Sequence, residues 1–165
     1  MPLVTTYLEM HSPGNLRPQH CTDPKFLVRQ KTEPDWRFNR DPYFAVGANW
    51  SWTDKQPWSD QQWKEYACAP ELRTFAAYQG ESLAGYYELR ADEDDAVEIA
   101  YFGLLPEFVG RGFGGPLLTS ALVEAWRMRP KVRRVWVHTC NRDHPRALAN
   151  YQARGLEIYK VVEEP

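Results

Sequence analysis

Apolar and polar residues alternate along much of the second half of the chain, which is typical of β-strands. Two alternating runs after residue 71 are separated by Gln79-Gly80-Glu81-Ser82, a sequence typical of a hairpin turn. Four consecutive acidic residues, 92–95, then form a solvated turn before a third run. A mixed β-branched and aromatic run near the N-terminus predicts a further strand. The expected strands are 4–10, 73–78, 83–90, 97–105, 134–140 and 156–162.

Helix signals lie between these strands. Ser59 and Gln62 match a capping box, which predicts that a helix begins at residue 59. Pro116 is compatible only with the first turn of the next helix, so that helix should begin near Gly112. An Asp followed closely by Pro, at 23–24 and at 143–145, is a typical helix start. The expected helices are 24–30, one from 59, one from near 112 to 129, and 145–154, while 36–57 is expected to be irregular.

Together these elements predict an α/β (mixed α+β) domain with a sheet of six or seven strands and about four helices. The 165 residues are expected to form a single domain, 1–165, because this length buries a sizeable core without needing a second one. Residues 1–71 contain few strand signals, whereas 72–165 contain most of the regular pattern.

Composition narrows the classes of function. The formal net charge of −2 and the absence of a Lys/Arg-rich run give no indication of a nucleic-acid partner. No apolar run approaches the roughly 18 residues of a membrane span, and the N-terminus does not resemble a signal peptide. The three cysteines are scattered, which favours a reducing, cytoplasmic location over a disulfide framework. No cluster of His, Cys, Asp or Glu has the spacing of a metal site.

Four glycines lie within six residues between the strand 97–105 and the following helix. A glycine-rich turn that leads into a helix N-terminus can hold a phosphate, because unpaired backbone N–H groups and the helix dipole both favour an anion. Gly110, Gly112 and Gly115 match the dinucleotide pattern G-x-G-x-x-G. That fingerprint also needs the strand to run directly into the first glycine and an acidic residue about 20 positions later. Neither is present, and no Gly-Lys-Ser/Thr follows for a P-loop.

The stretch resembles instead the pyrophosphate-binding signature Q/R-x-x-G-x-G/A of the GCN5-related N-acetyltransferases (GNAT). It is written here VGRGFG, residues 109–114, with Val109 in place of the usual Gln or Arg. A second motif of the family, N-x-x-A-I-x-L-Y followed by K-x-G-F, resembles residues 144–156, with His144 in place of the usual Asn. The segment DHPRALANYQARG, residues 143–155, resembles a bacterial branch of the family. Together the two motifs cover residues 98–159 with the family's order of strands and helices.

The resemblance implies a GNAT fold, with a mostly antiparallel sheet that splays between its fourth and fifth strands, here 97–105 and 134–140. It implies acetyl-CoA as cosubstrate, 72–165 as the acetyl-CoA-binding core, and 1–71 as the acceptor side. The pantetheine arm would pair with the backbone of 102–105, and Gly103 suggests a bulge that directs an N–H at the thioester oxygen. The residues that would contact the cosubstrate are Phe102, Leu104, Leu105, Val109, Gly110, Arg111, Gly112, Phe113, Gly114, Gly115, His144 and Tyr151.

Two residues are expected to carry the chemistry. Glu98 matches the position of the catalytic glutamate in the histone-acetyltransferase branch, and a carboxylate in an apolar strand would have a raised pKa suited to a base. Its alternative role is a solvent-facing or Arg-paired strand end. Tyr151 matches the family's general acid, and its alternative role is an aromatic packed on the sheet. His138 and Cys140 are expected to be a buried structural pair, because direct transfer needs no cysteine intermediate.

The acceptor is expected to be a primary amine on a small molecule, bound by the aromatic-rich region before residue 60. Aromatic rings enclose amines through hydrophobic and cation–π contacts, and a carboxylate can pair with an ammonium. Alternatives are a protein lysine or N-terminus as acceptor, or a non-catalytic module that senses acyl-CoA. The resemblance also leaves open a homodimer. The candidate acceptor-binding residues are Tyr43, Trp50, Trp52 and Asp54.

Overall fold

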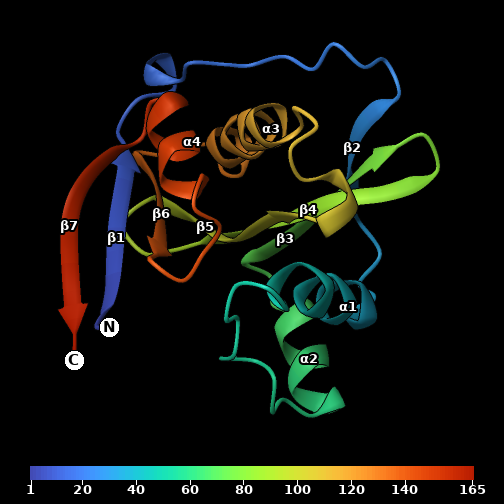
Figure 1. Ribbon diagram of the computed structural model, residues 1–165. Coiled ribbons are helices and arrows are strands. Elements are labelled where there is room, and N and C mark those ends of the chain that lie inside the picture. Colours follow the sequence, from blue (N-terminus) through green and yellow to red (C-terminus); the bar gives the residue numbers. More distant parts are fainter.

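The computed structural model describes residues 1–165 and contains one mixed sheet with two helices on each face (Figure 1). The strands are β1 (Leu3–Met10), β2 (Phe26–Lys31), β3 (Leu72–Gln79), β4 (Ser82–Ala91), β5 (Ala96–Leu104), β6 (Arg134–Cys140) and β7 (Glu157–Glu164). The helices are α1 (Trp36–Gly47), α2 (Asp60–Ala67), α3 (Gly114–Arg127) and α4 (Ala147–Ala153), with short 3-10 turns at Pro13–Asn15 and Pro106–Phe108. The predicted mixed sheet and its five strands after residue 71 are confirmed.

The strand order is β2-β3-β4-β5-β6-β1-β7, and every neighbouring pair is antiparallel except β5 and β6. The parallel pair is short. It joins only Ala96, Val97 and Glu98 to Arg134, Val135 and Trp136, and beyond Glu98 the two strands separate. The expected splay between 97–105 and 134–140 is therefore present, and it divides the sheet into two halves.

The first strand lies in the half that otherwise consists of the C-terminal strands. β1 is inserted between β6 and β7, and the chain then crosses the α3–α4 face to reach β2 at the opposite edge (Figure 1). Two hydrogen bonds fix this crossing segment: the Arg17 N–H donates to the Arg154 carbonyl at 2.9 Å, and the Gln19 N–H donates to Thr119 Oγ1 at 2.9 Å. The segment thus passes close to the N-terminal turns of α3.

The main core lies between the sheet and α3. Tyr87 and Leu89 of β4, with Val97 and Ile99 of β5, pack against the apolar stripe of α3. Alternation along a strand sends the neighbouring side chains to the other face, where α1 and α2 cover the sheet. On that face a second cluster joins Tyr43, Trp63, Tyr66 and Leu72. The two faces therefore have separate cores.

The expected helix at 24–30 is wrong, because this segment is the edge strand β2. Asp23 does not cap a helix; its carboxylate accepts the Lys25 N–H at 2.9 Å and the Gln79 side-chain amide at 3.0 Å, which ties it to β3. Phe26 and Val28, two residues apart, both pack against the main core. The alternation of buried and exposed side chains therefore makes this segment a strand, and the Asp23–Pro24 pair begins a turn instead of a helix.

The expectation that 36–57 is irregular is also wrong for its first part, which is helix α1. Asp35 caps this helix by accepting the Arg37 N–H at 3.1 Å. Pro42 lies inside the helix and removes one backbone hydrogen bond, but its ring is buried together with Tyr43 and Val46. Tertiary packing against the sheet therefore offsets the cost of a proline in the helix.

The remaining helices are close to the expected positions. The capping box of Ser59 and Gln62 is present at the start of α2. α3 begins at Gly114, two residues after the predicted start, with Pro116 in its first turn. α4 begins at Ala147 and is shorter than expected, because Asp143 does not cap it. The His144 ring instead accepts the Arg146 N–H at 3.0 Å through Nδ1.

Candidate active site

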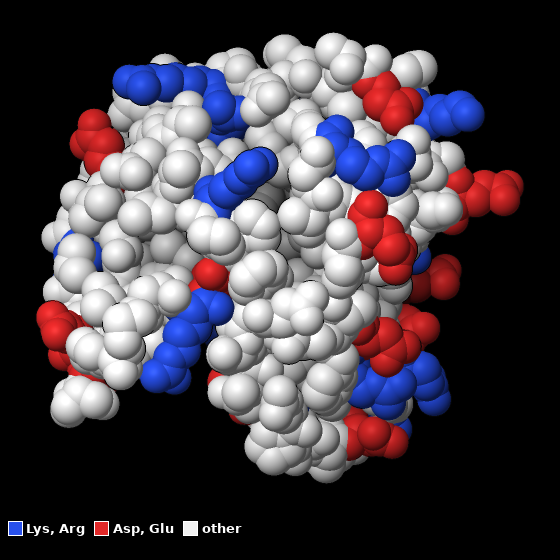
Figure 2. All heavy atoms as spheres, viewed as in Figure 1, with Lys and Arg blue, Asp and Glu red and all other residues white.

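A cavity of about 1050 Å³ occupies the gap where β5 and β6 separate. Its wall includes the cavity-facing parts of both strands, the glycine turn before α3, one side of α4, and the loop between α1 and α2. Lys, Arg, Asp and Glu are interspersed over the face of the molecule shown in Figure 2, many of them along its margins. Because its wall includes both the glycine turn and the loop between α1 and α2, the cavity joins the predicted acetyl-CoA core to the predicted acceptor side.

The glycine turn presents free backbone donors at one end of the cavity. Gly110 and Gly112 have φ of +79° and +87°, which L side chains rarely adopt, and a Cβ on either would meet no atom within 4 Å. The N–H groups from Gly110 to Phe113 donate to no protein acceptor, and no side chain caps α3. An open turn with unpaired donors at a helix N-terminus fits the diphosphate of acetyl-CoA.

Most of the residues predicted to contact the cosubstrate line this cavity. They are Phe102, Leu104, Val109, Gly110, Gly112, Gly114, Gly115, His144 and Tyr151. Three others support the turn from outside the cavity wall. Phe113 is buried and stacks on Phe26, the Arg111 guanidinium lies over the rings of Phe108 and Phe113, and the Leu105 N–H donates to the Ala84 carbonyl at 2.8 Å.

The bulge expected at Gly103 lies three residues earlier. Gly103 pairs regularly with Tyr86, whereas the register shifts between Ile99 and Tyr101, so that Ala100 is the extra residue. Gly103 is needed for a different reason: a Cβ there would overlap Cγ1 of Val46 on α1. Beyond Glu98, the edge of β5 that faces β6 has no strand partner, which leaves backbone groups of this segment available to a ligand.

Glu98 lies at the point where β5 leaves β6. Its side chain is 17% exposed and its Oε1 is 4.0 Å from Nε2 of His138. Burial raises the pKa of Glu98, while the nearby His138 and Arg90 act in the opposite direction. The carboxylate therefore has the environment of a base whose pKa is above the usual range of a glutamate.

His138 is not buried as expected: its side chain is 48% exposed, and it faces the cavity two residues from Cys140. It lies near Glu98 instead of forming a closed pair with the cysteine. Burial raises the pKa of the Cys140 thiol, which favours its protonated and weakly nucleophilic form. The geometry thus couples His138 to the carboxylate and leaves the thiol as part of the wall.

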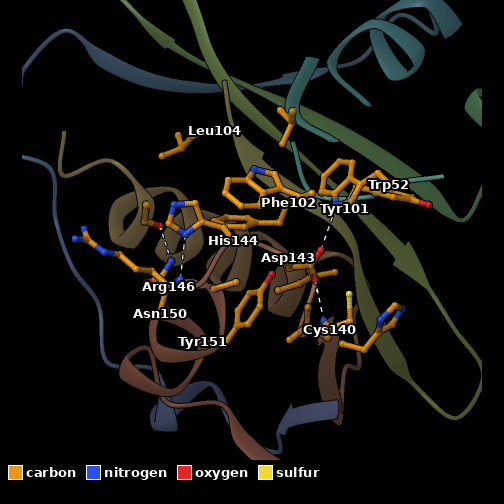
Figure 3. A pocket seen from close by; sticks show the side chains of 18 of the residues that line it. Trp52, Tyr101, Phe102, Leu104, Cys140, Asp143, His144, Arg146, Asn150 and Tyr151 are labelled. Carbon is orange, nitrogen blue, oxygen red and sulfur yellow. Dashed lines mark hydrogen bonds between the residues drawn. The ribbon is translucent and has the colours of Figure 1, made fainter. Parts of the chain in front are cut away.

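Tyr151 on α4 is part of the same cavity wall as Glu98 and lies close to Phe102 (Figure 3). Its ring is buried, yet its hydroxyl makes no hydrogen bond to a protein group and is directed into the cavity. Burial, followed by the charge of Asp143, raises the pKa of this phenol. The hydroxyl is therefore protonated and available to donate a proton.

Two tryptophans of the loop after α1 reach across the cavity to the segment between β6 and α4. The Trp52 indole donates to Asp143 Oδ1 at 3.3 Å, a link drawn in Figure 3, and the Trp50 ring lies 4.9 Å from the His144 ring. Asp143 is held in turn by Thr139 Oγ1 at 2.6 Å and by the Cys140 N–H at 3.0 Å. The loop thus bridges the two halves of the molecule over the gap.

The other two candidate acceptor residues form a network with a lysine that sequence reasoning missed. Asp54 accepts hydrogen bonds from Tyr43, Lys55 and Tyr101. The Lys55 ammonium lies between the rings of Trp58, Tyr66 and Tyr101, 4.6–4.9 Å from their centroids. Only its position next to Asp54 hinted at this role. Asp54 therefore already has an ammonium partner within the chain.

A family model described as the acetyltransferase (GNAT) family matches residues 31–156, well over half of the chain. The chain belongs to the GNAT family of acetyltransferases. The matched region contains the glycine turn, Glu98 and Tyr151, whereas β1 and β7 lie outside it. No protein with curated annotation matches the sequence.

Solved structures share the GNAT fold at low sequence identity. A GCN5-related N-acetyltransferase from Sphaerobacter thermophilus has a TM-score of 0.73 at 15% identity, over 99% of this chain and 53% of its own. One from Kribbella flavida has a TM-score of 0.65 at 14% identity, over 99% and 60%. An IAA acetyltransferase from Bacillus cereus has a TM-score of 0.61 at 22% identity, over 82% and 79%.

The chain thus spans little more than half the length of the first two structures. Membership in the GNAT family implies acetyl-CoA as cosubstrate. No helix of the structure combines the length and the hydropathy needed to cross a membrane.

Proposed function

We propose that this GNAT enzyme moves an acetyl group from acetyl-CoA to a primary amine of a small molecule, by direct attack in a ternary complex. One observation carries the proposal: Glu98 and the Tyr151 hydroxyl face the same cavity from different elements, and the open glycine turn is part of its wall. We further assign the chain to a bacterial branch, on the DHPRALANYQARG segment, and to the cytoplasm, which its three free cysteines favour.

The donor side needs only binding and orientation from the protein. The thioester of acetyl-CoA supplies the activated acetyl group. The unpaired N–H groups from Gly110 to Phe113 would bind the diphosphate, and the free edge of β5 would align the pantetheine arm. The bulge at Ala100 breaks the ladder near the expected position of the thioester, where an N–H donor could stabilise an oxyanion.

The transfer itself requires two proton movements. The amine nitrogen forms a bond to the acyl carbon and gives a proton to Glu98, directly or through water. The carbon–sulfur bond then breaks, and the Tyr151 hydroxyl donates its proton to the departing thiolate. A glutamate with a raised pKa suits the first role, and an unpaired, protonated phenol suits the second. Glu98 would return its proton to solvent, and Tyr151 would regain one, before the next cycle.

A small acceptor is favoured by the way the loop after α1 covers the cavity. Trp50 and Trp52 bridge to His144 and Asp143, and these contacts would hinder the entry of an extended peptide there. The acceptor would therefore contact an aromatic wall that includes Trp52 and Tyr101. Tyr43, buried behind this wall, would hold it in place through Asp54.

The test is release of the CoA thiol with a panel of small amines, using the wild type, Glu98→Gln and Tyr151→Phe. Loss of one general acid or base should lower kcat by roughly 10²–10⁴-fold. Matched controls are Glu81→Gln in an exposed turn and Tyr78→Phe on β3, both outside the cavity, and neither should change kcat. Unchanged kcat in both site variants would overturn the residue roles.

The two other candidate functions give different results in the same assay. A protein acetyltransferase would label lysines or N-termini of peptides much faster than any small amine of the panel. A sensor module would bind acetyl-CoA in calorimetry and acetylate neither amines nor peptides. Either result would overturn the small-molecule proposal.

A further inference from the structure

Arg90 is a cation on the acceptor side of the cavity that the proposed transfer does not use. It lies on β4 directly opposite Glu98 of β5, and both side chains are part of the cavity wall. Directly opposite residues of an antiparallel pair have Cβ atoms about 4.5–5.5 Å apart. A ligand group that contacts Arg90 would therefore be only a few bonds from one that contacts Glu98.

The Arg90 guanidinium has no carboxylate partner within the protein. No carboxylate oxygen lies within 4.0 Å of its nitrogens, so Arg90 forms no ion pair. The guanidinium lies over the Tyr66 ring, with its carbon 5.2 Å from the ring centroid. Without a carboxylate partner, N–H donors of its planar fork remain available to a ligand.

None of the neighbouring carboxylates forms an ion pair with Arg90. Asp54 is committed to Lys55 and Tyr101. Glu88, behind the cavity wall, accepts from Asn39 at 3.2 Å and from Tyr66 at 3.3 Å, and burial raises its pKa to about 7. Glu98 is beyond ion-pair distance and serves as the proposed base. Lys55 is thus paired with Asp54, whereas Arg90 has no carboxylate within ion-pair distance.

We propose that Arg90 binds a carboxylate of the acceptor, so that the acceptors are amino acids or similar amino carboxylates. This inference rests on the proposed acetyl transfer, because it places the reacting amine beside Glu98. A monoanionic carboxylate matches one guanidinium fork, whereas a phosphate dianion would bring excess negative charge next to Glu98. Arg90 thus determines specificity and takes no part in the proton transfers.

The rest of the acceptor wall favours an apolar side chain on the amino acid. Trp52 and Tyr101 lie with their ring centroids 5.2 Å apart, and Val46 packs beside them at the cavity wall. Neither ring presents a free charged group, since the Tyr101 hydroxyl bonds to Asp54 and Lys55. Phenylalanine, leucine and methionine are therefore suitable probes.

The experiment compares each of these three amino acids with its primary amide, which keeps the amine and removes the negative charge. In the wild type, kcat/KM should be roughly 10- to 100-fold higher for the acid than for the amide, as expected of hydrogen bonds between charged groups. In Arg90→Gln this ratio should fall by roughly 10- to 100-fold, through loss of activity on the acid alone. The lower basicity of the amides' amines affects both enzymes equally, so the change in ratio reports Arg90.

Arg90→Lys keeps the charge without the fork and should retain part of the preference. Arg29→Gln, an exposed arginine of β2, is the control and should keep the wild-type ratio. An equal ratio in the wild type and Arg90→Gln, or a wild type that prefers the amides, would overturn the role of Arg90 while leaving acetyl transfer intact. A wild type that acetylates neither acids nor amides nor other amines would overturn the proposed function and this inference together.

Discussion

Trp52 and Asp143 join the two halves of the molecule, because the indole N–H of one donates to the carboxylate of the other at 3.3 Å over the gap between β5 and β6. The two residues come from opposite sides of the cavity, the α1–α2 loop and the segment between β6 and α4. The backbone of the sheet makes no connection at this level, since β5 and β6 pair only up to Glu98. This side-chain bond therefore fixes the loop over the acceptor side.

Trp52→Phe should loosen that loop while keeping most of its aromatic packing on Tyr43 and Tyr101. We expect the acceptor KM to rise several-fold and the free energy of unfolding to fall by about 1 kcal/mol, the usual contribution of one hydrogen bond. Steady-state kinetics and urea unfolding measure the two effects. The control is Trp126→Phe on α3, whose buried indole N–H has no partner to lose. Equal KM changes in both variants would contradict the bridging role.

Gly112→Val should abolish binding of acetyl-CoA through the local conformation of the turn. At φ +87° a β-branched residue is strained, and its side chain would occupy the open space where the phosphate is expected. We expect a loss of at least tenfold in affinity by calorimetry, with about 1–3 kcal/mol of destabilisation.

Gly80→Val is the matched control for this strain. Gly80 has φ +62° in the turn between β3 and β4, also with no atom near a Cβ, but it lies outside the cavity. It should lose similar stability and bind acetyl-CoA normally. If both variants lose affinity equally, global destabilisation would explain the loss instead of a phosphate site.

The donor half of the site was predictable because its information is local. Gly110 and Gly112 are required by positive φ within one turn, and the strand before them and the helix after them have clear periods. The bulge was misplaced, since Gly103 serves the approach of Val46 from a helix nearly 60 residues earlier. The sequence pattern cannot distinguish a glycine needed for a bulge from one needed for close packing.

The acceptor half depends on contacts between distant residues, and most of it was not predictable. Lys55 meets Tyr101 only because the loop folds onto β5, and Arg90 becomes a candidate ligand only because β4 pairs with β5 at Glu98. The position of β1 between β6 and β7 likewise depends on pairing with strands that are more than 120 residues later in the chain. The helix and strand propensities of single residues give no information about these long-range contacts.

Glu98 should give the reaction a pH dependence. Burial raises its pKa, and only the ionised form accepts a proton, so kcat/KM should rise with pH through a range above that of an ordinary glutamate. The raised pKa also means that the folded protein favours the protonated form of Glu98. The contribution of this residue to the free energy of unfolding is therefore complete below pH 4.5 and is lost as pH rises. Glu98→Gln should therefore lose activity without losing stability at pH 7. A variant that unfolds more easily there would contradict this.

The close packing of Gly103 on Val46 can be tested by a double-mutant cycle. Gly103→Ala should cost about 1–3 kcal/mol, because the new methyl group overlaps the Val46 side chain. Val46→Ala removes that side chain, so the double variant should be more stable than the sum of the single effects predicts, by about 1 kcal/mol or more. Urea unfolding of the four proteins measures the coupling. Simple additivity would show that α1 moves away from β5 at little cost.

Glu88 should make the protein less stable above neutral pH. It is fully buried, and burial raises its pKa to about 7 from an ordinary 4.5. A raised pKa means that its contribution to stability is complete below pH 4.5 and disappears as pH rises through about 7. Each pKa unit corresponds to about 1.4 kcal/mol, so Glu88→Gln should be more stable than the wild type at pH 8 by roughly 3 kcal/mol, and nearly equal to it at pH 4.5.

Glu88→Gln is suitable for this test because the amide keeps an oxygen that can accept from Asn39, and the Tyr66 hydroxyl can accept from its nitrogen. Glu65→Gln, an exposed glutamate of α2, is the control and should follow the wild type at both pH values. Urea midpoints at pH 4.5 and pH 8 give the comparison. Parallel pH curves for the wild type and Glu88→Gln would show that Glu88 does not change its charge over this range. A gap that opens only above pH 4.5 would show that the buried carboxylate lowers stability as it ionises.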